Sequence, residues 1–251
     1  MAIVIQVHNI STVLSGAQLA PILAAVEAQV GQDVAPHWGN QSVVFRQVAS
    51  SQDFTPSAWR FVVADTSDQA GAAGYHETDG ATPIGYAFAK TTLEAGMQPS
   101  VTISHEAIEM VGDALIDQSN QWSDLPHALF LAQELCDPVE DDSYGYMKNG
   151  VLVSDFVTPA YFVPASHGPW DFRGVLKAPN SLALGGYQLI WDPKNGWRQQ
   201  IDSTATTQSS HSGSGAMAPG RISRFALRSA HSRSTRRLMK AASRTAATKL
   251  A

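Results

Sequence analysis

Cysteine is nearly absent from this chain, since Cys136 is the only one among 251 residues. A single cysteine excludes an intrachain disulfide, and nothing in the sequence indicates an oxidising compartment. Long apolar runs are missing too, because no stretch approaches the roughly 20 apolar residues of a transmembrane helix. The N-terminal residues lack the basic start and apolar stretch of a classical secretion signal. We therefore expect a soluble protein without a membrane span, located in the cytoplasm or associated with a particle.

Acidic residues are absent from the last part of the chain. Residues 221–251 hold nine Lys or Arg and no Asp or Glu, whereas residues 1–220 hold the other eight basic and all 22 acidic residues. A basic tail can bind nucleic acid, an anionic membrane or an acidic protein surface, including that of a second copy of the chain. It can equally be a disordered, solubilising tail. The acidic remainder of the chain argues against a broad nucleic-acid-binding face.

The composition predicts one domain followed by a linker and the tail. A hydrophobic content of 44% over this length can bury one substantial core. Residues 203–220 are rich in Ser, Thr and Gly, which is typical of a flexible linker. We therefore place a globular domain at residues 1–201, a linker at 202–220 and the basic tail at 221–251.

Apolar residues follow strand and helix periods in turn, which predicts an α+β fold. In the first half we predict a strand at Ile3–Val7, a helix at Ala17–Val30, and strands at Val43–Val48, Trp59–Ala64 and Ile84–Ala89. In the second half we predict a helix at Leu125–Gln133, a hairpin that turns at Asn149 and Gly150, and strands at Tyr187–Trp191 and Trp197–Gln200. A mixed sheet is thus followed by a β-rich lower subdomain.

The run from Ser104 to Asp113 carries the clearest chemical signal. Residues four apart share one face of an α-helix, so His105 and Glu109 can close on one metal ion while Glu106 stands beside them. In the related H-E-x-x-H pattern two histidines hold zinc, and the intervening glutamate takes a proton from the bound water. We therefore predict two ligands and a general base on a helix half buried under a sheet. The alternative is a set of solvated polar contacts on one helix face.

The metal is left open by the glutamate that replaces the second histidine. Its negative charge lowers the Lewis acidity of zinc and makes manganese or calcium more plausible. Zinc is the cofactor that we predict, with calcium and manganese as alternatives.

A third protein ligand is expected if zinc keeps one position open for water. Asp113 is near in sequence, but it lies about 12 Å from His105 along a continuous helix. It reaches the metal only if the helix ends at Gly112, which is a plausible break.

The other candidates lie in an acidic run that follows the predicted helix at Leu125–Gln133. Glu134 or Asp137 can ligate the metal, and Asp137 can instead orient His105 through a hydrogen bond. The run also reads as an acidic loop at a helix end, with or without calcium. Cys136 within it either contacts the metal or is a buried structural thiol.

Four segments together resemble a known family. They are Gly74-Tyr75-His76, then Ser104-His105-Glu106-x-x-Glu109-Met110, then Glu134-Leu135-Cys136-Asp137-Pro138-x-Glu140, and the run from Gly150 to Pro159. Over roughly residues 1–200 the chain resembles a largely uncharacterised family of bacterial and phage-associated proteins with a zincin-like signature. The resemblance implies a zincin-like metallopeptidase fold, either active or retained as a scaffold.

The resemblance also implies roles for particular residues. Glu134 resembles the glutamate that completes the site in zinc proteases of the glutamate-ligand type, where a later helix supplies it. Zincins place an edge strand before the active-site helix, where an extended peptide can add to the sheet, and Ile84–Ala89 takes that position. Tyr75 and His76, in a glycine-bounded loop leading to this strand, would donate hydrogen bonds to an oxyanion. His76 could equally be a metal ligand, and the pair could also form a plain surface turn.

Three functions follow from these patterns. The first is a metal-dependent hydrolase, most simply a zincin-like peptidase that acts on a peptide or protein substrate. The second is a structural or assembly protein, in which the same metal site stabilises the fold and the basic tail docks to a partner or to another copy. The third is a nucleic-acid-binding protein recruited through the tail.

Overall fold

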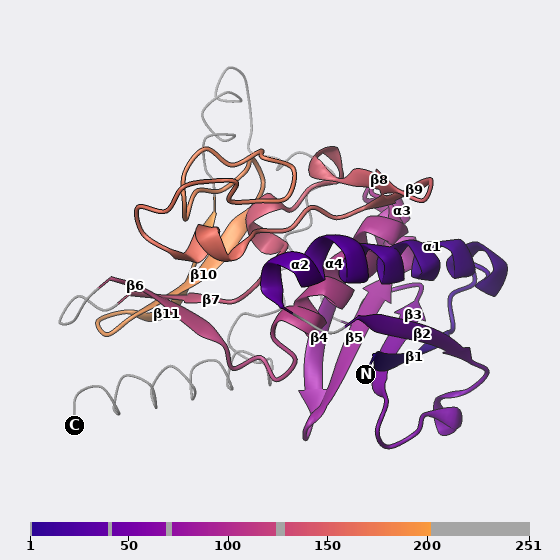
Figure 1. The fold of residues 1–251 in the computed structure, drawn as a ribbon. Helices are drawn as coiled ribbons and strands as arrows, with labels where there is room; N and C mark the ends of the chain where they lie inside the picture. The colour runs from indigo at the N-terminus through magenta and orange to yellow at the C-terminus, as the bar shows by residue number, and fades with distance from the viewer. Residues whose placement is uncertain (1, 40–41, 69–71, 124–128, 202–251) are drawn as a thin grey trace, which may run out of the picture.

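The computed structural model describes residues 2–39, 42–68, 72–123 and 129–201 of the chain. These residues form an α+β fold with two sheets, a separate hairpin and few helices (Figure 1). The predicted linker at 202–220 and the basic tail at 221–251 lie outside the described residues. In the described part, no helix has both the length and the apolarity that a membrane crossing requires.

The first sheet has four parallel strands and one antiparallel strand at its edge. The order across the sheet is β2 (Val43–Val48), β1 (Ile3–Asn9), β3 (Trp59–Ala64), β5 (Thr82–Phe88) and β4 (Gly74–Asp79). All four strands predicted in this region are confirmed. The prediction that Ile84–Ala89 forms the edge is wrong, because residues 74–79 form an antiparallel strand outside β5 rather than a loop.

Two long helices, α1 (Gly16–Gln29) and α4 (Pro99–Gly112), lie over one face of this sheet (Figure 1). Helix α1 confirms the predicted helix and packs on β2, whereas α4 packs on β4 and β5. The chain leaves α1 through a π-helical turn, Val30–Val34, into the short α2 (Ala35–Trp38), and another short helix, α3 (Ala89–Glu94), follows β5.

Two glycines of the sheet leave room for side chains of α4. A Cβ on Gly85 of β5 would lie 2.5 Å from Met110 Sδ, and a Cβ on Gly74 of β4 would lie 2.8 Å from Glu106 Oε1. Both distances are shorter than a real side chain tolerates, so glycine is required for this packing. The other side of α4 packs on the later hairpin, so the helix is buried from Pro99 to Val111 rather than half buried as predicted.

The second half of the chain builds a smaller antiparallel sheet. Its order is β11 (Gly196–Ile201), β10 (Tyr187–Asp192), β7 (Leu129–Ala132) and β6 (Ser119–Ser123). The predicted strands in β10 and β11 are confirmed. The helix predicted at Leu125–Gln133 is wrong where the structure describes it, because β7 pairs with β6 and β10. A short apolar run such as this one fits a helix or a strand equally well by periodicity.

The predicted hairpin is confirmed. Strands β8 (Tyr146–Lys148) and β9 (Val151–Val153) pair antiparallel, and Asn149 and Gly150 between them have φ angles of 50° and 81°. These positive values are those that an Asn-Gly turn accepts most readily. The remaining segments include short 3₁₀ helices at Ser51–Asp53, Asp137–Val139, Asp142–Tyr144 and Pro159–Phe162.

Two aspartates that follow β9 in the chain, Asp155 and Asp171, form a buried pair. Both side chains have no exposed area. Asp171 accepts hydrogen bonds from the backbone N–H groups of Val175 and Leu176, and Asp155 accepts one from Phe156. Burial, and next the neighbouring carboxyl of Asp171, raise the pKa of Asp155 to about 8. Asp155 is therefore protonated in the folded protein at neutral pH.

We expect Asp155→Asn to stabilise the fold in a pH-dependent way. Since the folded pKa lies above the value of 3.8 expected in the unfolded chain, the wild type loses stability as pH rises from about 4 to 8. Asparagine keeps an acceptor oxygen and cannot ionise, so its advantage over the wild type should grow by on the order of 4 kcal/mol between pH 5 and pH 8. Thermal unfolding at pH 5 and pH 8 measures the difference.

The exposed Asp79→Asn is the matched control, because Asp79 lies at the end of β4 with a largely exposed side chain. It should shift Tm little at either pH. A gap between Asp155→Asn and the wild type that does not widen with pH would show that Asp155 is ionised in the folded state.

Candidate metal centre

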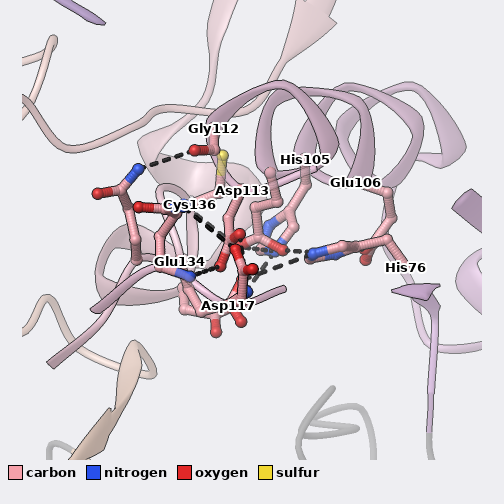
Figure 2. A network of polar contacts seen from close by, with 12 residues as sticks. His76, His105, Glu106, Gly112, Asp113, Asp117, Glu134 and Cys136 are labelled. Carbon is pink, nitrogen blue, oxygen red and sulfur yellow. Dashed lines mark hydrogen bonds and ion pairs between the residues drawn. The ribbon is translucent and has the colours of Figure 1, made fainter. Parts of the chain in front are cut away.

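Three parts of the chain bring a buried cluster of histidines and carboxylates together below α4. Helix α4 contributes His105, Glu106 and Glu109, and the edge strand β4 contributes His76 (Figure 2). The loop after β7 contributes the rest of the cluster, Glu134, Cys136 and Asp137. Each of these side chains is at most 2% exposed. So much buried charge is stable only when it is paired or holds a cation.

His105 lies between two carboxylates. Its Nε2 atom is 3.1 Å from Glu109 Oε1, one helical turn further on, and 3.1 Å from Asp137 Oδ1. Glu109 Oε1 also accepts a hydrogen bond from the backbone N–H of Cys136, at 3.3 Å. The four-residue spacing of the H-E-x-x-E pattern thus places His105 and Glu109 in contact, as the sequence predicts. Asp137 and the backbone of Cys136, from the later acidic run, contact the same two side chains.

His76 faces the same cluster from the sheet. Successive side chains of a strand point to opposite faces, and His76 is a buried member of β4. Its Nδ1 atom is 3.5 Å from Glu106 Oε2 and 3.6 Å from Glu109 Oε2. Its Nε2 atom is 4.0 Å from Glu134 Oε2. The prediction that His76 lies in a loop is wrong, because it belongs to strand β4. The pleat of the strand determines that its side chain points toward the cluster.

These donors form two groups that could each hold a metal ion. One group is His105, Glu109 and Cys136, and the other is His76, Glu109 and Glu134. Within each group the ligand atoms lie within 4.8 Å of one another. Nitrogen, thiolate and carboxylate ligands suit a transition metal, and zinc in particular takes all three.

Asp137 provides a further indication that the cluster fits a cation. Its Oδ2 atom is buried and has no hydrogen-bond partner among the described residues. Burial, and next the charge of Glu109, raise the pKa of Asp137 well above its usual value, although the contact with His105 lowers it. Buried carboxylates that repel one another in this way are stabilised by a divalent cation.

Two predicted site residues, Asp113 and Tyr75, make their polar contacts outside this cluster. Helix α4 ends at Gly112 as predicted, but the carboxylate of Asp113 accepts backbone N–H groups from Asp117 and Gln118, at 3.0 Å each. Burial raises the pKa of Asp113 to about 6. Asp113 therefore stabilises the turn after the helix, and its position does not support a role as third ligand.

Tyr75 belongs to the other face of the sheet. Its ring stacks on Tyr86 of β5 with centroids 4.6 Å apart, and its hydroxyl donates to Asp68. Since strand neighbours alternate, the direction of His76 into the cluster turns Tyr75 away from it. The structure thus corrects the prediction that Tyr75 donates to an oxyanion at this site.

The sequence gives only a weak indication that Cys136 could be a metal ligand. Its place inside the acidic run is that indication, and a buried structural thiol is the interpretation that the sequence favours. The structure groups it with His105 and Glu109 because the loop after β7 passes directly below α4.

Comparison with known proteins assigns the chain to no family. The chain matches no protein-family model, no curated protein and no solved structure. The zincin-like resemblance therefore stays a prediction, and the case for function depends on the site itself.

Proposed function

We propose that the protein is a metal-dependent hydrolase, and more narrowly a zincin-like peptidase. The observation that carries the proposal is Glu106, a buried carboxylate that stands between the two metal-binding residues of α4 and belongs to neither donor group. A glutamate that stands beside helix-borne metal ligands is the arrangement in which metallopeptidases activate water.

Zinc is the metal that fits this donor set best. Two histidines and a cysteine favour zinc over calcium, which prefers oxygen ligands alone. Manganese remains the second choice because carboxylates make up the rest of the set. When bound, the metal supplies Lewis acidity, which lowers the pKa of water toward neutrality and polarises a carbonyl group.

The residues of the chain would bind the metal, transfer the proton and position the substrate. His105 and Glu109, with Cys136 or Asp137 beside them, would hold the metal. Glu106 would accept the proton of the attacking water and return it to the leaving amine. Since β4 is the edge of the first sheet and carries His76 into the cluster, an extended peptide pairing with this edge would pass beside the site. The edge strand thus supports a peptide substrate.

A second candidate function is supported by the burial of the site. A catalytic centre must admit substrate, whereas every side chain of this cluster is at most 2% exposed. In a structural or assembly protein the same residues would hold a metal that ties α4 to β4 and to the loop after β7. Such a closed site is typical of structural zinc.

The test is a digestion experiment on the full chain, loaded with zinc after dialysis against metal-free buffer. A mixture of unstructured peptides is incubated with the protein, and new termini are identified by mass spectrometry. We expect cleavage that requires zinc and disappears in His105→Ala/Glu109→Ala. Bound zinc without any cleavage would overturn the peptidase and favour the structural function.

A further inference from the structure

We infer that the cluster is a two-metal centre in which Glu109 bridges the ions. The inference rests on the metal centre of the proposed function, but not on its hydrolytic activity. It is carried by the two carboxylate oxygens of Glu109, which face different histidines. Oε1 lies 3.1 Å from His105 Nε2, and Oε2 lies 3.6 Å from His76 Nδ1.

The remaining donors also fall into two sets, one beside His105 and one beside His76. Cys136 belongs to the group on the His105 side, where Asp137 also contacts the imidazole. Glu134 belongs to the group on the His76 side. Zinc takes four ligands at about 2.0–2.3 Å, so one ion could not use six donors. Two ions that share one carboxylate would use all of them.

Inter-donor distances on the His105 side match those of a metal centre. Ligand atoms around a tetrahedral ion with bonds of about 2.0 Å lie roughly 3.3 Å apart. Glu109 Oε1 and Asp137 Oδ1 each lie 3.1 Å from the same nitrogen of His105. On the other side His76 Nδ1 lies 3.6 Å from Glu109 Oε2, and His76 Nε2 lies 4.0 Å from Glu134 Oε2, so the donors are more widely spaced there.

Charge favours two ions over one. Four carboxylates meet in the cluster, those of Glu106, Glu109, Glu134 and Asp137, and their described partners here include two histidines. One divalent cation would leave about half of this buried negative charge without a metal counter-charge. With the thiolate of Cys136 as a further ligand, two divalent cations offset the formal negative charge of these donors more fully than one, and the ions of two-metal hydrolytic sites lie about 3.5–4 Å apart.

The experiment counts metal ions in the full chain. Apo protein is titrated with zinc chloride, and native mass spectrometry gives the ions bound per chain. We expect two for the wild type, one for Glu134→Gln and one for Cys136→Ser/Asp137→Asn. The matched control is Glu94→Gln, an exposed residue of α3, which should keep two.

A second measurement uses only the wild type, so its result does not depend on whether a variant folds. Cobalt(II) replaces zinc in the wild type, and the electron paramagnetic resonance signal is followed as the second equivalent enters. Two ions bridged by Glu109 should couple and reduce the signal per ion. Saturation at one ion, or a second ion with no coupling, would overturn the two-metal centre.

The outcomes separate this inference from the proposed function. One bound zinc with peptide cleavage would leave the peptidase intact and remove the second ion. Two coupled ions without cleavage would establish the centre and remove the peptidase. A chain that binds no zinc would remove both.

Discussion

Removal of the metal should lower the Tm of the full chain by about 10 °C. The cluster buries at least four carboxylates against two histidines, and a cation that binds only the folded chain stabilises it by mass action. At a metal concentration about 1,000 times the Kd this stabilisation is about 4 kcal/mol, and each kcal/mol shifts Tm by roughly 2–4 °C in a domain of this size. Thermal unfolding with and without a strong chelator measures the shift.

The control for this experiment is His105→Ala/Glu109→Ala, which removes ligands common to the site. Its Tm should not respond to the chelator, whereas the wild type should recover when zinc is restored. A wild-type Tm that is the same with and without chelator would show that contacts between histidines and carboxylates hold the cluster without a cation.

Local sequence patterns predicted most of the first sheet and helix α1. Strands such as Val43–Val48 and Trp59–Ala64 occur at the predicted residues because their apolar runs are short and bounded by turn-forming residues. The Asn149 and Gly150 turn was equally local. The strand β7 was missed because the choice between helix and strand at Leu129–Ala132 is made by pairing with β6 and β10, which are distant in sequence.

The candidate site was predictable only where its residues share one helix. His105, Glu106 and Glu109 follow from α-helical spacing alone. Which later carboxylates join them depends on tertiary structure. Glu134 and Asp137 join through the path of the loop after β7, which cannot be read from the spacing of residues in the sequence. The same holds for His76 and Tyr75, whose opposite directions depend on a strand that the sequence presented as a loop.

Glu106→Gln should lower peptide hydrolysis by roughly 100- to 10,000-fold without loss of metal. General-base catalysis by a positioned side chain contributes rate enhancements of about this size. Glutamine has the same shape as glutamate, and Glu106 lies in neither donor group. Metal content and the cleavage rate are measured on the same preparation.

The exposed Glu94→Gln again serves as the matched control, since it makes the same chemical change at a residue of α3 that is not part of the cluster. It should cleave at the wild-type rate. A Glu106→Gln protein that cleaves as fast as the wild type would exclude the base role. If the variant instead lost metal, Glu106 would be a ligand, because its Oε2 already lies 3.5 Å from His76 Nδ1. The proton acceptor would then have to be Glu134 or Asp137, because Glu109 is a ligand in both donor groups.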